Sequence, residues 1–182
     1  MDLTSNDNIK VINTTRDDLD LILWLFQQAI NMQGKNGYKV WEGIDKTALL
    51  KDIDDGFQYK IVKDDKVVCI FSIQFSDPFI WRDKDKGNAI YLHRIVVNPD
   101  YKGQKQFLKV LTWAKEFATE KKLQFVRMDT WADNEKIIEY YKSFGFRLIE
   151  NYKTTDAPEL PIQNRNLDVA LLEMDLVNLS QK

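Results

Sequence analysis

The segment from residue 89 to residue 130 constrains the fold more than any other part of the chain. It begins with an apolar run, Ala89–Val97, that ends just before Pro99, and a second apolar run covers residues 124–130. From about Gln104, apolar residues recur between the two runs at helical spacing: Phe107, Val110, Leu111, Ala114, Phe117 and Ala118. A strand, a helix and a strand in this order form a crossover, which makes the two strands parallel neighbours in one sheet. The sequence therefore predicts a mixed α/β class.

The other segments extend this pattern on both sides. We expect strands at residues 9–13, 59–62, 67–75, 146–150 and 167–176, with a turn at Asp64 and Asp65. A helix should begin at Thr15, because Asp18 follows three residues later as in a capping box. A second helix is expected at residues 46–53. A further helix should be capped by Asp133 and run to about residue 144.

Length, charge and cysteine content exclude several classes of protein. A chain of 182 residues fits one compact domain, residues 1–182, and a net charge of -2 provides no basic field for DNA or RNA. The single cysteine, Cys69, cannot form an internal disulfide, which is typical of a reducing compartment. No apolar run approaches the roughly 20 residues that span a bilayer, and the N-terminus lacks the pattern of a signal peptide. We expect a cytoplasmic protein without a nucleic-acid or membrane partner.

Two stretches could carry chemistry. The first, YLHRIVVNPDYKGQKQF (91–107), joins a strand to a helix through a loop with Gly103, Lys102 and Lys105. Unpaired N–H groups at a helix start attract phosphate, and the lysines would add charge. Taken alone, such a loop is more often only a turn. In the second, DTWADNEKIIEYYKSFGF (129–146), Asn134 and Tyr141 lie seven residues apart and so share a helix face. A tyrosine phenol can donate a proton to a leaving group, although a structural role in packing is the simpler interpretation.

Together the two stretches resemble the GNAT superfamily of acetyl-CoA-dependent N-acetyltransferases. The family's cofactor motif, V-x-P-x-x-[QR]-x-x-G-x-[GA], is similar to VNPDYKGQKQF, and its later motif, N-x-x-(A/I)-x-x-x-Y-x-x-x-G-F, matches Asn134, Ile137 or Ile138, Tyr141, Gly145 and Phe146. The resemblance covers residues 9–176. It implies a strongly twisted mixed sheet with the order β-α-α-β-β-β-α-β-α-β-β.

The resemblance has one departure, in the cofactor loop. Lys102 stands where the family has glutamine or arginine, and Lys105 and Phe107 stand where it has glycine or alanine. Small residues at these positions let the pyrophosphate approach the backbone closely. Lys105 can pair with a phosphate and Phe107 can pack inward, or the loop can bind the cofactor only weakly.

The resemblance also implies site residues for acetyl-CoA as cosubstrate. Backbone groups near Ile95, Val96 and Val97 would pair with the pantetheine arm. The pyrophosphate would lie on the amides of Lys102, Gly103, Gln104, Lys105, Gln106 and Phe107. Asn134 and Tyr141 would complete the cofactor site, and Tyr141 has the family's position for the general acid that protonates the departing thiolate.

His93 is the candidate general base, because an unperturbed imidazole has a pKa near 6.5 and the chain has no other histidine. A histidine that only packs in the sheet is an equally simple interpretation. Strand alternation places His93 on the face of Tyr91, Ile95 and Val97.

The expected acceptor is a small-molecule amine or a peptide N-terminus, in a pocket drawing on Tyr38, Trp41, Trp81 and Trp131, with Phe79 beside them. Asp129, Asp133 or Glu42 could attract a cationic amine, although a surface charge or a helix cap is the simpler interpretation of each. No metal is expected, because no His, Cys or Asp cluster has metal-ligand spacing in the sequence. The resemblance also allows a homodimer. The alternative function is a non-catalytic GNAT-like domain that binds an acyl-CoA or a protein partner.

Overall fold

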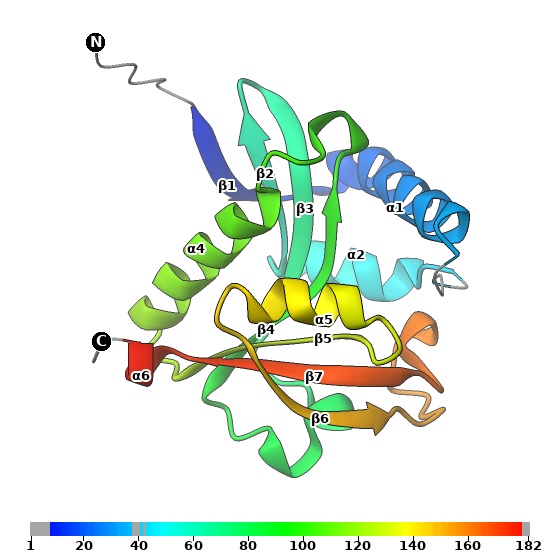
Figure 1. The fold of residues 1–182 in the computed structure, drawn as a ribbon. Helices are drawn as coiled ribbons and strands as arrows, with labels where there is room; N and C mark the ends of the chain where they lie inside the picture. The colour runs from blue at the N-terminus through cyan, green and yellow to red at the C-terminus, as the bar shows by residue number, and fades with distance from the viewer. Residues whose placement is uncertain (1–7, 38–40, 42, 180–182) are drawn as a thin grey trace.

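The structure, a computed structural model, describes residues 8–37, 41 and 43–179 and contains one mixed sheet between helices (Figure 1). The sheet has seven strands in the order β1-β2-β3-β4-β5-β7-β6. The strands are β1 (Ile9–Asn13), β2 (Gln58–Lys63), β3 (Lys66–Gln74), β4 (Ala89–Val97), β5 (Phe125–Trp131), β6 (Arg147–Lys153) and β7 (Asp168–Asp175). The helices are α1 (Leu19–Lys35), α2 (Lys46–Asp54), α3 (Pro78–Trp81), α4 (Gln106–Glu120), α5 (Glu135–Lys142) and α6 (Leu176–Leu179). The predicted class and the parallel pairing of β4 with β5 are confirmed.

The two faces of the sheet carry different helices, as Figure 1 shows for α4 on one side and α1 with α2 on the other. The apolar faces of α4 and α5 cover one side, where Leu92 of β4 belongs to their cluster. The helices α1 and α2 pack on the other side against Ile70 and Val96. Tyr91, which alternates with Leu92 along β4, packs with α3. Among the described residues, no helix combines the length and the apolarity needed to cross a membrane.

A fork opens between β4 and β5. The two strands pair from Ala89 opposite Phe125 to Leu92 opposite Met128 and no further. Beyond that point β4 stays with β3 and β5 stays with β7 to the ends of both strands. In the described part of the chain, β4 and β5 therefore do not pair with each other along the fork, and a ligand can approach the facing edge of β4.

A β-bulge lies on the β4 side of the fork. His93 is opposite Ser72 and Val96 is opposite Ile70, so two residues of β4 face the single Phe71 of β3. Arg94 in this bulge has a φ of 49°. The expected alternation is therefore wrong beyond His93, because the extra residue reverses it. Ile95 and Val97 pack on the α4 face, opposite to Tyr91.

Two helix starts differ from the sequence prediction, and one helix was not expected. The expected bond between Thr15 N–H and the Asp18 carboxylate forms at 2.8 Å, but residues 16–18 make a 3₁₀ turn and α1 begins afterwards. The cap of α5 is Asn134 rather than Asp133, because the Asn134 side chain accepts from the Ile137 amide at 3.2 Å. The short helix α3 lies in a segment expected to be a loop, where Pro78 occupies its first turn.

Candidate active site

A pocket of about 560 Å³ opens at the fork. Its walls combine the diverging ends of β4 and β5 with residues of α1, α2 and α5, the segment after β3, and the loop between β6 and β7. A concave site that several elements of a domain build together is the usual place for a small ligand. Of the residues expected to contact the cofactor, Ile95, Val96, Asn134 and Tyr141 line this pocket, whereas Val97 and residues 102–107 do not.

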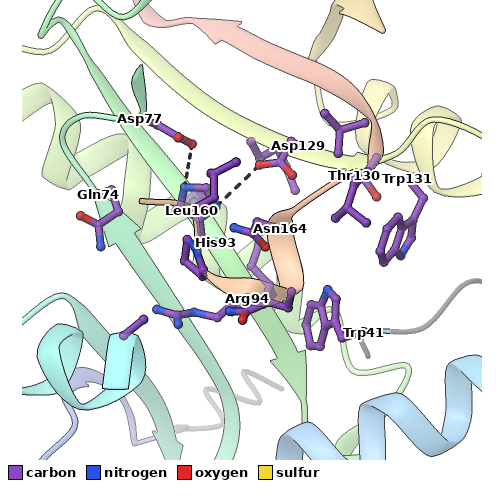
Figure 2. A pocket seen from close by; sticks show the side chains of 18 of the residues that line it. Trp41, Gln74, Asp77, His93, Arg94, Asp129, Thr130, Trp131, Leu160 and Asn164 are labelled. Carbon is purple, nitrogen blue, oxygen red and sulfur yellow. Dashed lines mark ion pairs between the residues drawn. The ribbon is translucent and has the colours of Figure 1, made fainter. Parts of the chain in front are cut away.

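His93 lies at the centre of the pocket between two carboxylates, and dashed lines in Figure 2 join it to Asp77 and Asp129. Its Nε2 is 3.1 Å from Oδ2 of Asp77, and its Nδ1 is 3.6 Å from Oδ1 of Asp129. Asp129 follows the last paired residue of β5 in the fork, and Asp77 directly precedes α3. Three segments that are distant in the sequence thus meet around one imidazole, whose two nitrogens face different carboxylates.

The proton affinities of these groups are coupled. Burial by itself lowers the pKa of His93, but the hydrogen bond and charge of Asp77, with the charge of Asp129, outweigh it, so that the pKa rises above 6.5. Burial raises the pKa of Asp129 to about 6, with His93 opposing the change and Asp77 adding to it. The pKa values of both groups are thus raised by their shared, buried position, and such coupled shifts are typical of acid–base sites.

A buried network holds Asp77 in place from behind. The Asp77 amide donates to Asp85 at 2.9 Å, and the other Asp85 carboxylate oxygen accepts from the Tyr91 hydroxyl at 2.8 Å. Arg127 donates to the Tyr91 oxygen at 3.0 Å and pairs with Glu173 at 2.8 Å. The Arg127 and Glu173 side chains are almost fully buried, so this chain of bonds fixes the backbone that carries Asp77.

A second network occupies the floor of the pocket beside the bulge. The Arg94 guanidinium pairs with Asp52 of α2 and donates to the Ser72 hydroxyl at 3.2 Å. Gln74 donates to the other carboxylate oxygen of Asp52 at 2.8 Å. The charge of Arg94 is therefore already compensated inside the protein.

Tyr141 reaches the pocket from α5. Its ring centroid lies 4.8 Å from that of Phe107, and burial is the main reason why its pKa is raised well above that of a free phenol. The hydroxyl thus keeps its proton at neutral pH and can donate it. Tyr140, next to it, is exposed and does not line the pocket.

Phe107 is buried between α4 and α5. Its ring also contacts Phe144 at 5.0 Å and Phe146 at 6.3 Å between centroids. The bulky residue at a position where the family has glycine or alanine therefore points away from the loop and joins the two helices.

The loop before α4 has the backbone geometry of a phosphate-binding turn. Lys105 has φ 56° and ψ 37°, the left-handed region, and Gly103 has φ 79°. Within the described part of the chain, the amides of residues 103–105 donate no hydrogen bond. Lys102, Gln104 and Lys105 are exposed, whereas Gln106 is buried and donates to the Tyr101 carbonyl at 3.4 Å. Free amides at the start of a long helix, with two exposed lysines beside them, fit a phosphate group.

Trp41 and Trp131, which were expected to contact the acceptor, line the pocket together with Phe79. Trp41 packs edge-on against Phe26, with ring centroids 5.8 Å apart. Tyr38 and Glu42 lie outside the described residues.

The role expected for Trp81 is wrong. Its side chain is fully buried, packs against Tyr91 at 5.8 Å and lies under the Arg127 guanidinium at 4.6 Å. It does not line the pocket, because α3 turns it into the core.

Sequence reasoning missed several lining residues. Asp77 could have been recognised, since an aspartate before Pro78 is a helix-start signal. Glu159, Leu160 and Asn164 belong to a loop that gave no local signal. The atoms of Asp77, His93 and Asp129 that could bind a metal ion lie within 4.8 Å of one another, a cluster that the sequence does not reveal. The absence of a metal stays a prediction.

Comparisons with known proteins agree with this architecture. Residues 24–146 match the acetyltransferase (GNAT) family. The uncharacterized N-acetyltransferase YesJ of Bacillus subtilis strain 168 is 23% identical over 141 residues, which cover 73% of this chain and 78% of that protein. A GNAT-family acetyltransferase from Listeria monocytogenes 4b F2365 superposes with a TM-score of 0.75 at 18% identity, covering 92% and 94% of the two chains. The structure of yncA, a putative acetyltransferase from Salmonella typhimurium with its cofactor acetyl-CoA, gives 0.62 at 15% identity over 92% and 94%.

Proposed function

The chain belongs to the acetyltransferase (GNAT) family, and we propose that it acetylates a primary amine by direct attack, with Tyr141 as general acid and His93 as general base. Membership makes it an acyltransferase with acetyl-CoA as cosubstrate. The amine and the two catalytic roles are the proposal. The observation that carries it is the fork, since His93 and Tyr141 line one pocket at the point where β4 and β5 separate.

The residues on both sides of the fork fit the cosubstrate. The free edge of β4 at residues 95–97 offers backbone partners for the amide groups of the pantetheine arm. Lys102, Lys105 and the amides of residues 103–105 would hold the pyrophosphate. Bound acetyl-CoA supplies an activated acetyl group as a thioester.

The proposed catalytic steps use groups near opposite walls of the pocket. His93, whose charge Asp77 and Asp129 stabilise, accepts a proton from the acceptor amine directly or through one water. N–H groups on the free edge of β4 would stabilise negative charge on the acetyl oxygen. Tyr141, which keeps its proton at neutral pH, donates it to the leaving sulfur. No covalent bond to the enzyme is needed.

The second candidate is a non-catalytic domain that binds an acyl-CoA or a protein. Lys105 and Phe107 favour it, because they replace small residues of the family's cofactor motif. Two observations support the enzyme instead. Lys105 keeps the left-handed backbone that a glycine would adopt, and Phe107 points into the core between α4 and α5. A cytoplasmic location, a single domain over residues 1–182 and a homodimer stay predictions.

Calorimetric titration with acetyl-CoA separates the candidates, with coenzyme A and ATP as controls. The proposal expects saturable micromolar binding of acetyl-CoA, followed by release of free thiol when an amine is added. Binding without thiol release from any amine would favour the non-catalytic domain. Absence of binding at millimolar acetyl-CoA would reject the cofactor site itself.

A further inference from the structure

We propose that the pocket takes its acceptor as an ammonium ion between Asp77 and Asp129, and that it selects primary amines with an apolar body and no neighbouring carboxylate. This inference deepens the proposed acetyl transfer and rests on it. Its basis is the charge and burial of the pocket walls.

The two carboxylates have too few donors. Oδ2 of Asp77 and Oδ1 of Asp129 are buried from solvent and lie 3.1 Å and 3.6 Å from the two nitrogens of His93, whose neutral imidazole has a single N–H for both. Their side chains are only 11% and 18% exposed. A buried carboxylate oxygen without a donor is costly, so such a site favours a ligand that brings donors. An alkylammonium group offers three N–H donors and a positive charge.

His93 does not neutralise this pair. As imidazolium it adds one positive charge to two ionised carboxylates, which leaves a net charge of about -1, and as imidazole it leaves about -2. Above the pKa of Asp129, about 6, the centre of the pocket is therefore negative in both protonation states of His93. A cation is attracted, and the same field repels an anion.

The other described residues that line the pocket do not make its net charge positive. Arg94 is its other cationic residue, and Asp52 and Ser72 already hold its guanidinium. Glu159 adds another negative charge to the rim. An acceptor with a carboxylate beside its amine, such as an α-amino acid, would thus place that carboxylate near Asp77 and Asp129, where the described lining offers it no free cation.

The remaining walls favour an apolar body. Trp41, Phe79, Trp131 and Leu160 line the pocket around the charged centre. Aromatic and aliphatic walls bind a ligand mainly through the area that it removes from water. An amine with a hydrocarbon or aromatic body satisfies both parts of the pocket.

Three matched probes test the selection: 2-phenylethylamine, phenylalanine, which adds one carboxylate, and 2-phenylethanol, which lacks the ammonium group. Each is titrated calorimetrically into the protein saturated with coenzyme A. We expect 2-phenylethylamine to bind about 10- to 100-fold more tightly than either analogue, the range for a hydrogen-bonded charge pair. Equal affinity for phenylalanine would overturn the inference.

Two variants test the carboxylates themselves. Asp77→Asn and Asp129→Asn should each reduce the preference for the amine over the alcohol to about 3-fold, because each loses one negative charge at similar volume. Asp83→Asn is the control, since this side chain is 83% exposed and does not line the pocket. Unchanged affinity for coenzyme A confirms that the variants fold. A preference that survives in both Asn variants would overturn the inference.

The outcomes separate this inference from the proposed function. Acetylation of phenylalanine as fast as 2-phenylethylamine would reject the acceptor class and keep the enzyme. Failure to bind acetyl-CoA would reject the enzyme. Titration with Zn²⁺ adds a third arm, because tight Zn²⁺ binding that disappears in Asp77→Asn, without any amine binding, would reassign the three residues to a metal site.

Discussion

Lys105 combines a strained backbone conformation with an exposed positive charge, so its substitution should change both the stability of the protein and its affinity for the cofactor. Its left-handed backbone costs an L-residue about 1–2 kcal/mol, whereas glycine avoids this cost but loses about 0.5–1 kcal/mol through its larger unfolded-state freedom. Lys105→Gly should therefore raise the free energy of unfolding by about 0.5–1 kcal/mol. For a chain of this length, that corresponds to a rise in Tm of about 1–4 °C. Lys105→Ala keeps the strain and should not gain stability.

Cofactor binding should change in both variants alike. Each loses the exposed ammonium group, so affinity for coenzyme A should fall about 2- to 10-fold at low salt and less at high salt. Thermal unfolding and calorimetry at two salt concentrations measure the two effects, with Lys102→Ala as the matched change of charge. A Gly variant no more stable than the Ala variant would refute the backbone reasoning. Full affinity in both would remove Lys105 from the phosphate site.

Three further predictions concern the catalytic groups and their support. Tyr141→Phe should lower kcat about 10²- to 10⁴-fold with the Kd of acetyl-CoA nearly unchanged, as single-turnover kinetics can show; an unchanged kcat would contradict its role as acid. The kcat/KM should rise with pH through the pKa of His93, above 6.5, because only the neutral imidazole accepts a proton. In Asp77→Asn the pKa of His93 should fall, because only Asp129 then counteracts the effect of burial. The rise of kcat/KM should accordingly move to lower pH in a pH–rate profile. A rise at the same pH as in the parent protein would show that His93 is not the base. Phe107→Ala should reduce the free energy of unfolding by about 3–5 kcal/mol in denaturant titration, and a loss below about 1 kcal/mol would show that the aromatic cluster is not essential.

Much of the fold could be predicted because its determinants are local. The apolar periodicity of α4, the proline after β4 and the glycine after α5 are all written within short windows, and they led to the parallel pair and to the family. The position of Tyr141 followed from the same motif.

The bulge at Arg94 had no such signal. Arginine is an ordinary strand residue, and the residues that hold its side chain in the bulge, Asp52 and Ser72, are distant in the sequence. Strand alternation therefore failed beyond His93. The partners of His93 were missed for a related reason, since Asp77 and Asp129 reach it only after the sheet has formed.

The fork has a mechanical consequence. In the described sheet, backbone pairing joins the strands β1 to β4 to the strands β5, β7 and β6 through four residue pairs, from Ala89 opposite Phe125 to Leu92 opposite Met128. A ligand chain lying in the fork would contact both halves at once and add the backbone bonds that the two strands do not make with each other. The binding energy of this ligand then opposes separation of the two halves. The free energy needed to separate β4 from β5 should therefore increase with the concentration of the substrate. The amide hydrogens of β4 that face the fork should accordingly exchange with water quickly in the free protein and slowly when the fork is filled.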